Sequence, residues 1–113
     1  MSNARELIGT ALDGTGWTWR EIVSGIARGD FHLFQNETAA LIGEFIVSPR
    51  HKVMHIWLGG GDLAGVEALI EEAEAFGRRH GCDAGGATGR KGWVRALKKY
   101  GYRPAMAAVE KEL

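Results

Sequence analysis

The sequence predicts an α/β (α+β) fold, in which a mixed and mostly antiparallel sheet is flanked by helices. Apolar residues recur with a helical period in four segments and with a strand period in the segments between them. Three of the strand-like segments are consecutive and are joined by short connections. The predicted order is α-α-β-β-β-α-β-α-β. Because the 113 residues contain no linker or repeat, we expect a single domain over residues 1–113.

Two helices are predicted at the start of the chain, over residues 5–12 and 18–28. Thr18 is followed three residues later by Glu21, which is the spacing of a capping box at a helix N-terminus. Gly29 ends the second helix, because glycine readily adopts the left-handed backbone conformation of a C-terminal cap.

Three strands are expected next, over residues 31–35, 39–47 and 52–58. Their connections are short, so consecutive strands should pair antiparallel as a meander. Side chains alternate between the two faces of a strand, which places Glu44 on the same face as Ile42 and Ile46.

A glycine-rich turn leads from the third strand into the longest helix. Glycines 59–61 are expected to stop the strand, and Asp62 to cap the helix. The helix carries an apolar stripe formed by Val66, Leu69, Ile70, Ala73 and Phe76. A short strand over residues 82–87, a short helix over 92–100 and a last strand over 102–110 complete the prediction.

The composition is that of a globular domain, with 45% hydrophobic and 25% charged residues. No apolar run reaches 18 residues and no signal-peptide pattern opens the chain, so we expect no membrane contact and a cytoplasmic location. Cys82 is the only cysteine, which excludes an internal disulfide, and the histidines lack metal-ligand spacing, so no metal site is expected.

The formal net charge is zero, but the charges are unevenly distributed along the chain. Residues 1–77 hold 5 Lys/Arg and 11 Asp/Glu, a net charge of −6, whereas residues 78–103 hold 8 Lys/Arg and one Asp, a net charge of +7. This basic segment indicates either an anionic partner or a solvated face without a ligand. The pattern disfavours nucleic acid, because Trp93 and Tyr100 fall on the predicted buried face of their helix and are not free to stack on bases.

The order of elements from Phe31 to the C-terminus resembles the GCN5-related N-acetyltransferase (GNAT) superfamily. The segment Leu97 to Arg103 looks like the end of the small helix that is common there. The segments His55 to Asp62 (HIWLGGGD) and Gly89 to Trp93 (GRKGW) look like small GNAT-like proteins encoded in tailed phages and prophages. The resemblance implies the GNAT fold and, for a phage-encoded protein, the host cytoplasm.

The resemblance also implies acetyl-CoA as the cofactor. Backbone N–H groups at a helix start, approached closely past glycines, bind the CoA diphosphate in that superfamily. The cofactor-binding residues are then Gly59, Gly60, Gly61, Gly65, Arg90 and Lys91. The chain departs from the superfamily's signature, because Gly60 stands at the Arg/Gln position and Leu63 at a required glycine, and only Gly65 fits. As a helix cap, Asp62 would also occupy N–H groups and repel phosphate. The alternative interpretation of these glycines is a turn from a strand into a capped helix, with no role in cofactor binding.

Acetyl transfer to an amine needs a base for the ammonium proton and an acid for the departing thiolate. Glu44 and His55 lie on adjacent predicted strands and are the candidate catalytic bases; whether they face one cleft depends on a register that the sequence does not fix. The superfamily's acid is usually a tyrosine at the position of Leu97, whereas here the tyrosine is Tyr100, so no acid is assigned.

Two functional hypotheses follow. The first is a GNAT-fold acyltransferase that moves acetyl from acetyl-CoA to an amine. The alternative is a catalytically degenerate GNAT-like phage or prophage accessory protein, whose partner would be another protein. The acyl acceptor and the oligomeric state are left open.

Overall fold

A computed structural model describes residues 4–89, 91–105 and 109–113, with the side chains of residues 91 and 94 excepted. The elements are α1 (Ala4–Leu12), α2 (Trp19–Arg28), β1 (His32–Gln35), β2 (Ala39–Ser48), β3 (His51–Gly61), α3 (Leu63–Arg79), β4 (Ala84–Ala87), α4 (Lys91–Leu97) and a 3₁₀ turn (Lys98–Tyr100). None of the helices described is long and apolar enough to span a membrane.

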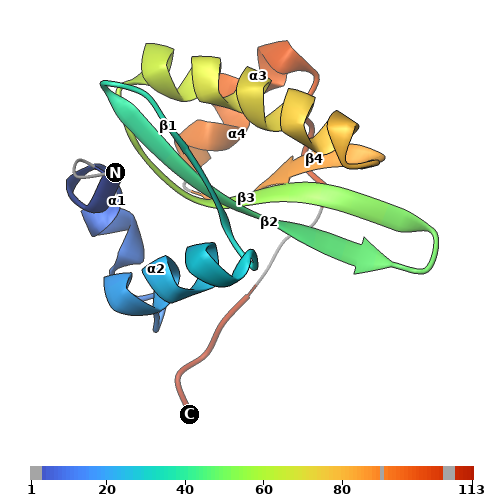
Figure 1. Cartoon of the computed structure of the whole chain (residues 1–113). Helices are drawn as coiled ribbons and strands as arrows, with labels where there is room; N and C mark the ends of the chain where they lie inside the picture. Colours follow the sequence, from blue (N-terminus) through green and yellow to red (C-terminus); the bar gives the residue numbers. More distant parts are fainter. Residues whose placement is uncertain (1–3, 90, 106–108) are drawn as a thin grey trace.

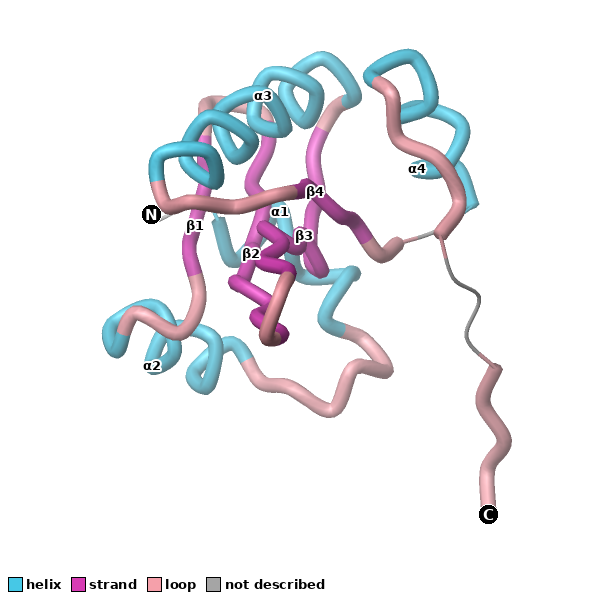
Figure 2. The backbone as a smooth tube through the Cα atoms, turned by 90° about the vertical axis from the view of Figure 1, so that its right-hand side faces the viewer, coloured by secondary structure: helices cyan, strands magenta, loops and turns pink. Residues whose placement is uncertain are grey.

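The four strands form one sheet in the order β1-β2-β3-β4. The first three strands pair antiparallel, and β4 runs parallel to β3. Helix α3 covers one face of the sheet, while α1 and α2 lie against the opposite face (Figure 1; Figure 2 shows the same layers from the side). The predicted mixed, mostly antiparallel sheet flanked by helices is therefore confirmed.

The two faces of the sheet carry separate apolar cores. The core beneath α3 contains Phe34, Ala39, Leu41, Met54, Ile56, Val66, Leu69, Ile70, Ala73 and Leu97. The core beneath α1 and α2 contains Ala4, Ile8, Ile22, Phe31, Ala40, Ile42 and Leu58. Neighbours on β2 alternate between the two cores, as the strand period predicts: Leu41 packs under α3 and Ile42 under α1. Each fully buried aliphatic side chain of this kind stabilises the fold by about 1.5–3 kcal/mol.

Helix α2 begins as its sequence predicts. The Glu21 backbone N–H donates to the Thr18 hydroxyl oxygen at 3.3 Å, and the Thr18 N–H donates to a Glu21 carboxylate oxygen at 2.9 Å. Gly29 ends the helix with a φ of 84°. These two bonds pair groups that a bare helix end would leave without partners.

Glycines 59–61 do not stop the third strand, contrary to the prediction. Strand β3 continues through Gly61, and its last residues pair with the start of β2, Gly59 opposite Leu41 and Gly61 opposite Ala39. Glycine costs backbone entropy in a strand, but its backbone groups pair as any residue's do. Here neighbouring elements approach too closely to leave room for side chains, as described below.

The predicted last strand over residues 102–110 is absent from its described part, residues 102–105 and 109–110; residues 106–108 lie outside the described residues. Pro104 has no N–H for a ladder. The Tyr102 hydroxyl donates to Glu74 of α3 at 2.7 Å, which ties this segment to the helix above β4. Residues 109–113 extend away from the body of the molecule (Figure 1).

Candidate functional site

Strands β3 and β4 run side by side for a short distance and then separate. They pair from Val53 with Ala84 to Ile56 with Ala87, and the Thr88 N–H still donates to the Ile56 carbonyl at 2.9 Å. Beyond this point β3 continues through Gly61, and its residues 58–61 pair with β2 alone among the described residues. The backbone edge of β3 that faces away from β2 is therefore left open for a ligand.

A β-bulge lies at the point of divergence. Ile42 pairs with Leu58 whereas the next residue, Gly43, pairs with Ile56, so Trp57 is one extra residue on β3. Bulges bend a strand and re-aim its side chains and backbone groups.

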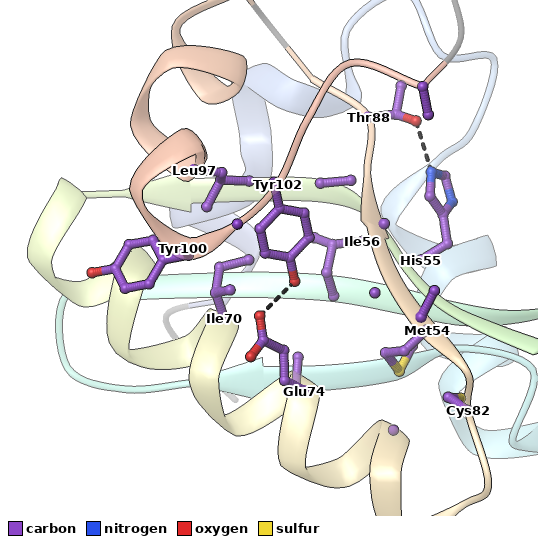
Figure 3. A pocket seen from close by; sticks show the side chains of 18 of the residues that line it. Met54, His55, Ile56, Ile70, Glu74, Cys82, Thr88, Leu97, Tyr100 and Tyr102 are labelled. Carbon is purple, nitrogen blue, oxygen red and sulfur yellow. Dashed lines mark hydrogen bonds between the residues drawn. The ribbon is translucent and has the colours of Figure 1, made fainter.

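A cavity of about 680 Å³ lies beside this open edge. Its walls come from the end of α1, from residues 57–61 of β3, from the Thr88–Gly89 loop and from α4, where Trp93 and Leu97 line it. A second cavity, of about 950 Å³, extends from α3 past β4 to His55 (Figure 3). Both are lined by Thr88 and Trp93, so both reach the point of divergence, and both volumes are within the range of small-molecule sites.

The two candidate bases are brought together. Glu44 on β2 is the direct cross-strand partner of His55 on β3. Directly opposed residues share a face of the sheet, with Cβ atoms about 5 Å apart. The register that the sequence left open therefore places both groups on the α1 and α2 side of the sheet, one residue before the strands part.

His55 is held in a defined orientation. Its Nε2 lies 2.7 Å from the Thr88 hydroxyl oxygen (Figure 3), and its Nδ1 is buried without a hydrogen-bond partner among the described residues. Burial lowers the pKa of His55 below its usual value of 6.5, with the Glu44 carboxylate opposing that shift. The imidazole is therefore neutral at pH 7, with the lone pair of one ring nitrogen unprotonated.

The strand-to-helix turn is capped from within. Asp62 Oδ1 accepts the Gly65 N–H at 2.7 Å and the Thr38 hydroxyl at 3.0 Å. The predicted helix cap is thus confirmed, and it occupies the N–H of one predicted cofactor-binding residue, Gly65. The N–H groups of Leu63 and Ala64 precede the first possible intrahelical bond and remain directed outward from the helix start.

The other turn glycines are in close contact with their neighbours. A Cβ on Gly60 would lie 1.7 Å from the carbonyl oxygen of Leu7 in α1, and one on Gly59 would lie 2.6 Å from the Trp93 ring. Gly61 has a φ of 119°, a conformation that L side chains rarely adopt. These contacts give all three residues a structural reason to be glycine, alongside their predicted cofactor role.

The two predicted basic ligands are only partly located. Arg90 lies outside the described residues, and so does the side chain of Lys91, whose backbone begins α4. Among the other basic residues of this segment, Lys99 forms an ion pair with Glu67 at 2.9 Å.

Neither nearby tyrosine is directed at the gap between β3 and β4. The Tyr100 hydroxyl donates to Glu67 of α3 at 2.5 Å, and its ring points away from His55 and Thr88 (Figure 3). The bond to Glu67 raises the pKa of Tyr100 to about 12. Burial and the bond to Glu74 likewise raise the pKa of Tyr102. Both hydroxyl protons are held by carboxylates, so the structure offers neither phenol as the acid.

Sequence reasoning missed Thr88 and Trp57. Thr88 follows a strand of small residues and carries no local signal, and its role depends on a contact across 33 positions. Trp57 falls inside the predicted strand over residues 52–58, and the sequence does not reveal the bulge because a bulge depends on the pairing with β2. The indole Nε1 of Trp57 is also buried without a partner among the described residues. Within that same part of the chain, no group of three or more His, Cys, Asp or Glu residues could hold a metal ion.

Comparisons with known proteins find similarity in fold to solved structures and no similarity in sequence to a known family. No family model matches the sequence, and no curated protein matches it either. An acetyltransferase from Trypanosoma brucei superposes with a TM-score of 0.70 at 14% identity, over 96% of this chain and 89% of that one. An aminoglycoside acetyltransferase from an uncultured soil metagenomic sample gives a TM-score of 0.70 at 11% identity, over 99% and 87%.

A transcriptional regulator from Bacillus halodurans is also similar, with a TM-score of 0.66 at 12% identity over 99% of this chain and 94% of that one. At these identities the likeness shows the fold alone. The chain thus has the fold of GNAT-type acetyltransferases, and its activity must be argued from its own site.

Proposed function

We propose that the protein is an acyltransferase that moves an acyl group from a CoA thioester to an amine. The observation that carries this proposal is the separation of β3 from β4 directly after the opposed pair Glu44 and His55. Shared fold with acetyltransferases supports it.

The open edge of β3 suits the extended arm of CoA. That arm contains amide groups, which pair with free backbone N–H and C=O groups as an added strand does. Residues 57–61 offer such groups next to the 680 Å³ cavity. The thioester supplies an activated acyl carbon and a thiol leaving group.

His55 is the proposed base. The amine nitrogen forms a bond to the acyl carbon, the carbon–sulfur bond breaks, and the amine proton passes to the neutral imidazole directly or through one water molecule. The thiolate leaves and takes a proton from solvent, since neither described phenol is directed toward it. Glu44, opposite His55, stabilises the imidazolium that forms.

The diphosphate is the part of CoA that this site accommodates least well. It can reach the N–H groups of Leu63 and Ala64, but the carboxylate of Asp62 stands beside them and takes the N–H of Gly65. This observation favours the second candidate function, a GNAT-like protein that binds a protein partner and has lost CoA. A phage or prophage setting belongs to the same proposal and rests on the sequence resemblance alone.

Asp62→Asn separates the two candidates. Asparagine caps a helix about as well as aspartate, so the melting temperature should stay within about 2 °C, while removal of the charge should tighten acetyl-CoA binding about two- to tenfold. S-acetyl-N-acetylcysteamine has the thioester without the diphosphate, and its affinity should not change. Titration calorimetry measures the binding of both ligands to the wild type and to Asp62→Asn. If neither protein binds acetyl-CoA, the acyltransferase proposal is rejected and the protein-partner function is supported.

Thiol release from acetyl-CoA over a panel of amines tests the base. We expect His55→Gln to lower the rate by about 10²-fold or more, the usual contribution of a general base. His51→Gln is the matched control, because His51 lies on the same strand, is exposed and has its Nδ1 3.9 Å from the Asp83 carboxylate rather than at Thr88. Equal rates for the two variants would remove His55 from the mechanism.

A further inference from the structure

One edge of β2 is open over half its length. Strand β1 pairs with β2 only up to Gly43, which lies opposite His32. The chain before β1 leaves the sheet there, because Phe31 is buried in the core under α1 and α2. Residues 44–48 therefore pair with β3 alone among the described residues, and the hairpin tip projects beyond β1 and α2 (Figure 1).

This edge exposes apolar side chains. Ile46 is 47% exposed and Val47 is 68% exposed, one on each face of the strand. Natural proteins protect open edges with lysine, proline, bulges or a covering segment. Residues 44–48 contain no lysine or proline, and β2 itself carries no extra residue there.

The backbone groups at this edge have a definite direction. The Asn36 N–H donates to the Ala39 carbonyl across the β1–β2 turn. The backbone N–H and C=O groups of residue 39, and of every second residue after it along β2, are therefore directed toward the β1 side. Phe45 and Val47 are thus the residues whose N–H and C=O groups are directed outward, without a strand partner among the described residues.

We infer that two copies of the chain pair through this edge, as antiparallel β2 strands centred on Ile46. Several twofold-symmetric registers would pair residues whose backbone groups are directed outward. The register centred on Ile46 uses all five open positions, 44–48, and leaves the pairing of β1 with β2 intact. It places Phe45 opposite Val47 of the second copy, with backbone hydrogen bonds in both directions. Ile46 then lies opposite its own counterpart.

The charges in this register are compatible. Glu44 lies opposite Ser48, so no like charges are opposed across the interface. Arg50 lies in the turn after β2, beyond the five paired positions, so it opposes no charge in this register. The interface is isologous, and it joins two four-stranded sheets into one continuous sheet.

Light scattering coupled to size exclusion tests the mass, expected at twice 12.3 kDa. Ile46→Lys places two like charges opposite each other at the centre of the interface. Val47→Pro removes an outward-directed N–H and leaves the hydrogen bonds between β2 and β3 in place. Each variant should raise the dimer dissociation constant at least tenfold. Val109→Lys, at a fully exposed position outside β2, is the matched control. Circular dichroism melting confirms that each variant is folded.

A cysteine pair tests the register. In a Cys82→Ala background, Ile46→Cys should form a disulfide between copies, because opposed residues lie within disulfide reach. Ser48→Cys should not, since the two residues would be about four positions apart along the paired strands. A monomer mass at millimolar concentration, or equal cross-linking at positions 46 and 48, overturns the inference. Neither outcome bears on CoA binding, so the proposed function stands or falls separately.

Discussion

At the scale of single residues, the site depends on how His55 is held. Its Nε2 is fixed by Thr88, which is itself fixed by a backbone bond from its N–H to Ile56. If Nε2 accepts the hydroxyl proton, Nδ1 carries the ring hydrogen; if Nε2 donates, Nδ1 carries the lone pair. Thr88 is thus a positioning residue for the proposed base.

Thr88→Val removes the hydroxyl and keeps the shape of the side chain. We expect the His55 tautomer population to shift and acyl transfer to fall by about tenfold, whereas Thr88→Ser should retain both. Nitrogen NMR of the imidazole reads the tautomer without any substrate. Unchanged ring nitrogen shifts in the valine variant would show that Thr88 does not orient His55.

The pH dependence of the reaction follows from the pKa of His55. Burial lowers this pKa below 6.5, so the neutral base is present throughout the range above that value and is lost only in more acidic solution. We expect the low-pH limb of the kcat/KM profile to have its midpoint below 6.5. A midpoint above 6.5 would assign the proton transfer to another group.

At the scale of elements, the backbones of β3 and α1 approach closely at a residue without a side chain, Gly60. A Cβ on Gly60 would meet the Leu7 carbonyl oxygen at 1.7 Å, and a carbonyl within a helix cannot move alone. Glycine at this position therefore sets how closely α1 approaches the end of β3 and shapes one wall of the 680 Å³ cavity.

Gly60→Ala should destabilise the fold by about 1–3 kcal/mol, the usual cost of overpacking. Gly9→Ala is the matched control, since nothing lies within 4 Å of its Cβ position and alanine favours a helix by about 0.5–1 kcal/mol over glycine. Urea unfolding measures both variants. A Gly60→Ala protein as stable as the wild type would mean that α1 can shift without loss of packing.

At the scale of the whole molecule, two histidines on opposite faces of the sheet link stability to pH. His55 lies beside Glu44, whereas His32 packs against the rings of Phe45 and Phe76 under α3. Burial lowers the pKa of both, with nearby His80 adding to the effect on His32.

Each of these histidines takes up its proton more readily in the unfolded chain than in the folded protein. The unfolded chain therefore binds more protons just below pH 6.5, and stability must fall as the pH drops from about 6.5 to the lowered pKa values. Above pH 6.5 both states are neutral and this contribution is constant. Thermal melting across pH 5–8 measures it, and the double variant His32→Gln, His55→Gln should give a flatter curve; an equally steep curve would attribute the acid loss to other groups.

Local sequence signals determined the elements of this protein. The capping box of Thr18 and Glu21 and the Asp62 cap were readable because each bond joins residues three positions apart. The alternation along β2 predicted which of its side chains share a face. These features depend on neighbours in the chain, which the sequence states directly.

Tertiary structure alone decided how the elements meet. The register that opposes Glu44 to His55, the bulge at Trp57 and the bond from Thr88 to His55 all depend on residues far apart in the chain. The glycines of residues 59–61 looked like a strand end, but close approach of α1 and Trp93 makes them part of β3. The predicted last strand is absent from residues 102–105 and 109–110 for the same reason. Its β-like composition is a local property, whereas the path of the chain beside β4 depends on the bond from Tyr102 to the Glu74 carboxylate of α3.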